Sequence, residues 1–259
     1  GKHKPQNCFQ NSQATLTERK MSRDITPDLH KIQLYLTEPH PCSYLSDKQA
    51  TTAFVDPKYP IDTRTYSHLS TIGFRRSGQY IYAPRCASCK SCIPVRVPVA
   101  GFQPTRSQKR CLKRNSDISA TVKSNINFDE HYTLYQKYID TRHSDGDMYP
   151  ATMTQYRDFI GKPWECSRFI EFRLDKKLIA CAVSDWLDDG LSAIYTYYDP
   201  DLSLRSLGTL AILRQISMVR EQTLDYLYLG YWIRDSEKMM YKSKFRPSEL
   251  YIENRWLRI

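Results

Sequence analysis

The sequence predicts an α+β fold, and three observations in its last third carry that prediction. First, Asp189-Gly190 lies between two apolar, β-branched and aromatic runs, which is a strong signal for a β-hairpin. Second, Ser206 precedes apolar residues at a spacing near 3.6, which indicates a capped helix. Third, residues 226–232 form an apolar and aromatic run that predicts a further strand.

The order of hairpin, glycine-bearing helix start, helix and strand resembles the acetyltransferase-like (GNAT) fold. In that fold an Arg/Gln-x-x-Gly-x-Gly/Ala loop holds a pyrophosphate at the helix N-terminus. Here the loop reads Arg205-Ser206-Leu207-Gly208-Thr209-Leu210. The branched side chain of Leu210 should block close approach of a coenzyme A pyrophosphate. We therefore expect an acyltransferase scaffold with another phosphate-bearing donor, although an ordinary helix start with one glycine is the alternative.

The other elements of this half follow from local signals. Asn127 and Glu130 have the spacing of a capping box and open a helix at 128–142. Asp235 is a candidate cap for a helix that Pro247 ends. The remaining predictions are a helix at 152–160 and strands at 168–174, 178–186 and 249–253.

Length and composition suggest a three-part division of the 259 residues. Residues 1–20 are polar and are expected to be a tag or a disordered extension. Residues 21–115 are expected to form a smaller, cysteine-containing α/β domain, and residues 116–259 the GNAT-like domain. The sequence has no signal peptide and no long apolar run, so we expect a cytoplasmic protein that does not associate with membranes.

Three cysteines recur at x-x spacing in Cys86-x-x-Cys89-x-x-Cys92. Thiolates on one loop can converge on a single ion, and Cys42, or His40 beside it, would supply a fourth ligand. The spacing does not distinguish zinc from an iron–sulfur cluster. The alternative is a group of free, half-buried thiols that packs a tight turn.

The net charge of +10 favours a polyanionic partner. Its densest part is a run of five basic residues in nine positions, most of which would share one helix face. Such a face suits phosphates, and a solvated basic surface is the alternative. The run comprises Arg106, Lys109, Arg110, Lys113 and Arg114.

Several motifs together resemble the aminoacyl-tRNA–protein transferases, over residues 32–256. They are Gly73-Phe-Arg-Arg-Ser-Gly, the cysteine run ending in Pro94-x-Arg96, Tyr197-Tyr-Asp-Pro with Arg205-Ser-Leu-Gly, and Tyr228-Leu-Gly-Tyr-Trp with Met240-Tyr-Lys. The compact length resembles bacterial members that move leucine from leucyl-tRNA to proteins beginning with Asp or Glu, in the N-degron pathway. The resemblance implies a tRNA partner rather than DNA, and a phosphate-binding role for Arg205, Ser206 and Gly208.

The resemblance also bears on a metal cofactor, which the eukaryotic branch is reported to hold at a Cys-x-x-Cys motif and a Cys-Cys pair. This chain departs from that pattern, because Cys42 has no second cysteine at the x-x spacing and Ser91-Cys92 replaces the pair. A site from Cys42, Cys86, Cys89 and Cys92 is therefore a hypothesis of its own. The implied chemistry, aminolysis of an activated ester, requires no cofactor.

Such a reaction needs positioning of two reactants, a proton acceptor and oxyanion stabilisation. An acidic N-terminal residue further requires a cation, and arginine pairs both carboxylate oxygens best. The candidates for orientation and proton transfer are Asp185, Tyr197, Tyr198 and Tyr231. The candidates for binding the acidic substrate are Arg75, Arg76 and Ser77, with Lys242 and Arg234 in the other half; Arg76 is preferred.

Two other functions stay open at this point. An acetyl-coenzyme A-dependent N-acetyltransferase would use the same scaffold, and Leu210 weakens that interpretation. A non-catalytic, metal-stabilised RNA-binding protein would account for the cysteines and the basic run, but it leaves the GNAT-like half without a role.

Overall fold

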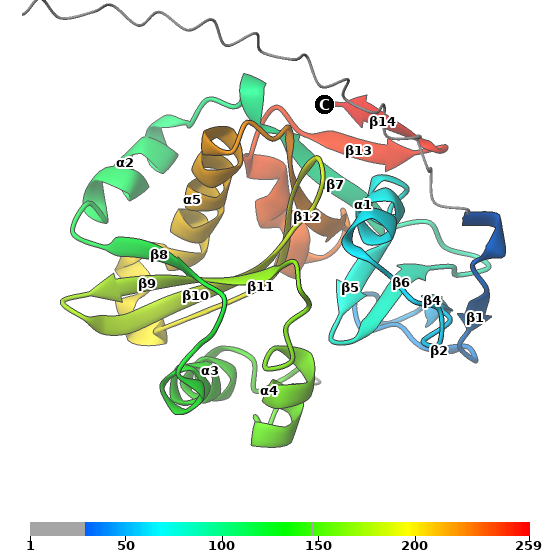
Figure 1. The fold of residues 1–259 in the computed structure, drawn as a ribbon, viewed down its shortest axis with the longest axis horizontal. Helices are drawn as coiled ribbons and strands as arrows, with labels where there is room; N and C mark the ends of the chain where they lie inside the picture. Colours follow the sequence, from blue (N-terminus) through cyan, green and yellow to red (C-terminus); the bar gives the residue numbers. More distant parts are fainter. Residues whose placement is uncertain (1–28, 147) are drawn as a thin grey trace, which may run out of the picture.

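An eight-stranded sheet forms the centre of the molecule (Figure 1). The structure is a computed structural model, and it describes residues 29–146 and 148–259, so the expected extension at 1–20 lies outside the described residues. The strands follow the order β14-β13-β7-β12-β11-β10-β9-β8. Their bounds are β7 (Ile93–Pro98), β8 (Ser119–Lys123), β9 (Ser167–Leu174), β10 (Lys177–Trp186), β11 (Gly190–Tyr198), β12 (Tyr226–Trp232), β13 (Glu249–Ile252) and β14 (Arg255–Arg258).

The predicted hairpin at Asp189-Gly190 is confirmed, because β10 and β11 pair in antiparallel fashion on either side of it. Gly190 also begins the contact with β12, which runs parallel to β11. A Cβ at position 190 would lie 2.1 Å from the carbonyl oxygen of Tyr226. The hairpin glycine therefore permits the close approach of the next strand as well as the turn.

Helices cover both faces of this sheet (Figure 1). On one face, α5 (Leu207–Glu221) packs against α2 (Arg106–Arg114) over a core that includes Leu210, Leu213 and Ile216. On the other face, α3 (Phe128–Arg142) and α4 (Met153–Phe159) enclose a second core rich in tyrosine. The side chain of Asn127 accepts a hydrogen bond from the Glu130 amide, as the predicted cap of α3 requires.

Two predicted helix starts differ from the structure. Ser206 has a left-handed backbone (φ 53°) and makes no side-chain cap bond, because it ends the preceding 3-10 helix η3 (Pro200–Arg205) and leads directly into α5. Asp235 does not cap the next element either. That element is a 3-10 helix, η4 (Glu237–Lys244), and the residue before it is Ser236.

The first part of the described chain forms a smaller sheet of four strands in the order β1-β4-β6-β5. One helix, α1 (Thr63–Thr71), lies beside it, and its cap is the Asp62 side chain, which accepts from the Thr65 amide. The strands are β1 (Leu34–Leu36), β4 (Thr52–Val55), β5 (Arg75–Ser77) and β6 (Tyr80–Pro84), and a separate pair is formed by β2 (His40–Pro41) and β3 (Gln49–Ala50). Two short 3-10 helices, η1 (Leu29–Lys31) and η2 (Val99–Gly101), complete the elements.

The strand β7 connects the two parts of the chain. It lies within the expected N-terminal domain, yet it pairs with β12 on one side and β13 on the other. The large sheet therefore extends across the expected boundary at residue 115, and the division into two domains stays a prediction. What the described residues establish is a mixed α/β fold. None of the described helices is long and apolar enough to cross a membrane.

Candidate functional site

The two parallel strands of the large sheet separate soon after they meet. β11 and β12 pair only from Gly190 to Ser192 on one strand and from Tyr226 to Tyr228 on the other. Just beyond, the Arg75 guanidinium from β5 lies against both strands. Its Nη2 donates to the Ala193 carbonyl at 2.6 Å. A Cβ at Gly230 would lie 2.4 Å from its Nη1, so the guanidinium occupies space that any other residue at 230 would fill.

Arg75 carries a polar atom that the fold leaves unused. Nη1 is buried and has no hydrogen-bond partner among the described residues. The groups that interact electrostatically with this guanidinium include the phenols of Tyr82 and Tyr231 and the ammonium group of Lys242. Burial raises the pKa of Tyr82, and the positive charge of Arg75 opposes that rise. An unpaired buried guanidinium nitrogen is costly, and an anionic ligand would remove the cost.

Lys242 adds a second cationic group to the same place. It is 6% exposed, and its Nζ donates to the Tyr231 carbonyl at 2.5 Å. The pKa of Lys242 is lowered to about 7, mainly by burial and also by the nearby Arg75 charge, while the Cys92 thiol opposes the shift. An amine with this pKa is partly neutral at neutral pH and can take or release a proton there. A carboxylate bound at Arg75 would favour the charged form.

Arg76 faces the other side of β5, because successive strand residues point to opposite faces. It is 3% exposed, and its Nε and Nη2 donate to the two oxygens of Asp185 at 2.7 and 2.8 Å. Its Nη1 donates to the Gly78 carbonyl. These bonds satisfy Arg76 inside the protein, whereas Arg75 keeps one nitrogen without a partner among the described residues. Which of the two arginines binds the acidic substrate stays a prediction.

Three of the four expected catalytic side chains are buried and make bonds within the protein. Asp185 also accepts from Tyr66 and from Ser167. The Tyr197 hydroxyl makes a hydrogen bond with His131 Nδ1 at 2.7 Å. The Tyr231 hydroxyl donates to the Gly73 carbonyl at 2.8 Å.

Tyr198 differs from the other three in exposure, since its side chain is only half-buried. Its ring packs against Tyr138, and a side-chain hydrogen bond joins the two phenols. A Cβ at Gly208, in the first turn of α5, would lie 3.6 Å from the Tyr198 ring, so Tyr198 lies beside the helix start.

The basic run and the start of α5 lie together, although they are far apart in the sequence. The Asn115 side chain, at the end of α2, donates to the Arg205 carbonyl at 2.8 Å, and Arg114 donates to the Leu204 carbonyl. Arg205 itself is paired with Asp117. Cys111, on the inner side of α2, is buried against the start of α5. The other basic residues of α2 are exposed, namely Arg106, Lys109, Arg110 and Lys113.

Ser77 and Arg234 have less defined positions. Ser77 is half-buried at the end of β5, and Arg234 is exposed just after β12. Two residues that lie beside Arg75, Gly230 and Tyr82, were not among the predicted site residues. A glycine inside the apolar strand Tyr228-Leu-Gly-Tyr-Trp is a known sign of close backbone approach, so Gly230 carried a readable signal. Tyr82 carried none beyond its position in a strand.

A metal site at the four cysteines stays a prediction, and in the structure these thiols are free. Across residues 29–146 and 148–259, no three side chains of the His, Cys, Asp or Glu types gather in a way that could hold a metal ion. The thiols make separate local bonds instead, with Cys86 donating to the Thr51 carbonyl and Cys89 to the Ser91 hydroxyl. Burial raises the pKa of Cys92 to about 11, and the thiols of Cys42, Cys86 and Cys89 add to the rise.

Comparison with known protein families identifies the class of this protein. The model of the N-terminal region of arginine-tRNA-protein transferase matches residues 40–110, and the model of its C-terminal region matches residues 130–252. The chain belongs to this family, as the sequence motifs indicated. The two matches include Arg75, the cysteines, β11, the start of α5 and Lys242.

The particular relatives carry a more specific name. The chain is 52% identical over 231 residues to the aspartate/glutamate leucyltransferase of Saccharophagus degradans, covering 89% of this chain and 98% of the relative. It is 51% identical over 232 residues to that of Hahella chejuensis, with 90% and 99% covered. Among solved structures it is similar to FemX, at 8% identity and a TM-score of 0.46, with 88% of this chain and 90% of FemX covered.

Proposed function

We propose that this protein transfers leucine from leucyl-tRNA to the N-terminal amine of proteins that begin with Asp or Glu. Its family membership and its leucyltransferase relatives support an aminoacyl-tRNA-dependent transfer. In this proposal β8–β12 with α3–α5 form an acetyltransferase-like core. The ester and the acceptor amine react where β11 and β12 separate.

The observation that carries the acceptor side is the buried, unpartnered Nη1 of Arg75. A carboxylate brought there would gain a charge-assisted bond from Arg75, and Lys242 lies close enough to add its charge. An uncharged residue of the same shape, such as asparagine, would leave the guanidinium without a counter-charge. Selectivity for Asp and Glu over their amides would follow from that difference.

The donor side is assigned to the start of α5 and to α2. The exposed basic residues of α2 would contact phosphates of the tRNA acceptor arm, and the first amides of α5 would hold the phosphate nearest the ester. Gly208 lies beside Tyr198, because a Cβ there would lie 3.6 Å from the Tyr198 ring. The leucyl ester would then extend along Tyr198 toward the Arg75 guanidinium, which lies in the gap where β11 and β12 separate.

In the reaction the acceptor amine attacks the ester carbonyl, the new amide bond forms, and the tRNA hydroxyl leaves with a proton. The amine must lose a proton, and Lys242 and Tyr198 are the candidates for accepting it. The register of β10 and β11 shifts between Val183 and Ser184, which leaves Ile194 as an extra residue on β11. Backbone groups at such a bulge are freed from the ladder, and an amide there would stabilise the oxyanion.

The test measures transfer of radiolabelled leucine from charged tRNA to peptides that begin with Asp or Asn. We expect the wild type to prefer the Asp peptide. Arg75→Gln should reduce kcat/KM for the Asp peptide by about a hundredfold, which corresponds to roughly 3 kcal/mol, and should leave tRNA affinity unchanged. Arg75→Lys should retain part of the preference because it keeps the charge.

The matched control is Arg255→Gln, an exposed arginine in β14, which should behave as wild type. A urea unfolding curve for each variant separates loss of binding from loss of fold. If Arg75→Gln is folded and keeps the wild-type ratio of Asp to Asn transfer, Arg75 does not bind the acidic residue.

A second candidate, acetyl-coenzyme A-dependent acetylation, is favoured by one observation. Leu210 is 1% exposed and packs in the core below α5, so its side chain does not obstruct the helix start as the sequence argument assumed. Titration calorimetry with acetyl-coenzyme A tests this candidate directly. Binding at micromolar concentration would support it, and lack of binding together with leucine transfer would remove it.

A further inference from the structure

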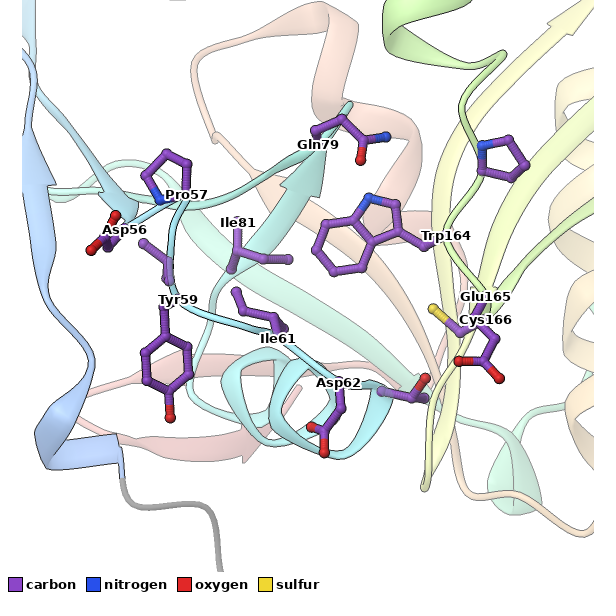
Figure 2. A pocket seen from close by; sticks show the side chains of 13 residues that line it. Asp56, Pro57, Tyr59, Ile61, Asp62, Gln79, Ile81, Trp164, Glu165 and Cys166 are labelled. Carbon is purple, nitrogen blue, oxygen red and sulfur yellow. The ribbon is translucent and has the colours of Figure 1, made fainter.

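A cavity lies away from Arg75, between the segment before α1 and the loop before β9 (Figure 2). Its volume is about 330 Å³, and its walls come from the segment between β4 and α1, from β6, and from the loop before β9. One wall is Trp164, whose ring packs over the Arg76 guanidinium at 5.6 Å. The cavity is therefore on the Arg76 side of β5, separated by that strand from the gap between β11 and β12.

Apolar and aromatic side chains form part of the inner surface of this cavity, beside its polar groups. Figure 2 shows the side chains of Ile61 and Ile81 beside the indole of Trp164, with the phenol of Tyr59 at the near edge. The indole is held in place, because its Nε1 donates to the Gly78 carbonyl at 3.2 Å. A ligand that enters would bury hydrocarbon surface, which stabilises binding by about 25 cal/mol per Å².

The charged residues that line the cavity are all acidic. They are Asp56, Asp62 and Glu165, and no lysine or arginine is among the described residues that line it. One oxygen of Asp56 accepts from the Lys58 amide, and one oxygen of Asp62 accepts from the Thr65 amide. Each carboxylate keeps further acceptor capacity, since an ionised carboxylate has about four lone-pair sites.

This sign of charge stands out in a chain of net charge +10. Phosphates and acidic N-termini, the ligands assigned to the other site, would be repelled here. An ammonium group would be attracted to these carboxylates while its carbon skeleton packed on Ile61, Ile81 and Trp164. The volume lies at the lower end of the range typical of small-molecule sites, which suits a single residue and its neighbour.

We propose that this cavity binds a primary ammonium group that lies next to an apolar side chain, as in the N-terminal leucine of a polypeptide. The inference stands on the cavity alone and does not depend on the transfer reaction. If that reaction is also correct, its product carries this group, and the cavity would hold product apart from the site that receives acidic acceptors.

The test uses the full chain, L-leucinamide as the probe, and the indole N–H signals in a proton–nitrogen NMR spectrum. Trp164→Phe assigns the Trp164 signal, and the other three tryptophans serve as internal references. We expect leucinamide to shift the Trp164 signal in a saturable way. N-acetyl-L-leucinamide, which lacks the charge, should bind at least about fivefold more weakly.

A double variant, Asp56→Asn with Glu165→Gln, should weaken leucinamide binding by about fivefold, since each exposed ion pair contributes at most about 1 kcal/mol. The matched control is Asp140→Asn with Glu221→Gln, two exposed acids outside the cavity, which should bind as wild type. The proposal is overturned if leucinamide leaves the Trp164 signal unchanged, if the acetylated compound binds equally well, or if both double variants weaken binding alike.

Discussion

Arg75 and Arg76 are adjacent in β5, and the alternation of the strand gives their guanidinium groups different environments. The Arg76–Asp185 pair is almost fully buried, with side-chain exposures of 2% and 0%. Removing one partner of such a pair leaves an uncompensated charge in the interior. We therefore expect Arg76→Met to lower the free energy of unfolding by about 3–5 kcal/mol in a urea titration.

The matched variant is Arg76→Met combined with Asp185→Leu, which removes both charges and should recover part of the loss. A single variant as stable as the wild type would mean that the pair is dispensable. That result would also return Arg76 to consideration as a substrate-binding residue.

Lys242 provides a prediction about pH. Its pKa is about 7 in the folded protein and 10.5 as the ordinary value, so between these values the unfolded chain binds the extra proton. Folding stability contributed by this group should therefore rise with pH, by at most about 1.4 kcal/mol per unit, and be level below pH 7. Lys242→Met has no such group. The difference in unfolding free energy between variant and wild type should be constant near pH 6 and should shift in favour of wild type from pH 7 to 9.

This difference is measured by urea unfolding of both proteins across that range, so that contributions from other titrating groups cancel. A difference that does not change with pH would show that Lys242 is not a strongly desolvated amine in the folded protein.

At the scale of elements, the gap between β11 and β12 depends on Gly230. Its backbone has φ 80°, and a side chain there would collide with Arg75. We expect Gly230→Ala to displace the guanidinium and to reduce transfer to Asp peptides at least as strongly as Arg75→Gln. The control is Gly146→Ala, outside the proposed site, where a Cβ would meet only the His143 carbonyl oxygen at 3.4 Å and transfer should match wild type.

Transfer activity and unfolding curves of both variants give the comparison. Equal activity of Gly230→Ala and wild type would contradict a role for the gap in the reaction.

The elements themselves were largely predictable, because their signals are local. The Asp189-Gly190 hairpin, the cap at Asn127 and the apolar spacing of α5 each depend on a few neighbouring residues. The position of β7 was not predictable, since its partners lie far along the chain and its own residues carry no trace of them. The same limit applied to the site. The Gly73-Phe-Arg-Arg motif indicates where site residues lie in the sequence. Which arginine faces the gap between β11 and β12 depends on how β5 pairs with β6 in the fold.

At the scale of the whole molecule, the basic charge of the chain is expected to determine how tRNA binds. Log affinity should fall linearly with log salt concentration, by about 0.7–0.9 per phosphate contact. Replacing Arg106, Lys109 and Lys113 by glutamine should reduce the magnitude of that slope by about two. Replacing Lys58, Lys176 and Arg255, which are exposed on other surfaces, should leave it unchanged. Filter binding at several salt concentrations gives the slopes, and equal slopes for the two triple variants would remove α2 from the interface.

The place of β7 in the large sheet has a consequence for how the chain is made. During synthesis β7 emerges well over a hundred residues before β12 and β13, the strands between which it lies. Until they appear, its backbone donors and acceptors have no ladder to join, and this kind of distant pairing slows folding. Conversely, residues 116–259 alone would present β12 as an unprotected sheet edge, a template for association with other chains. The two halves of the sequence therefore depend on each other to complete the large sheet.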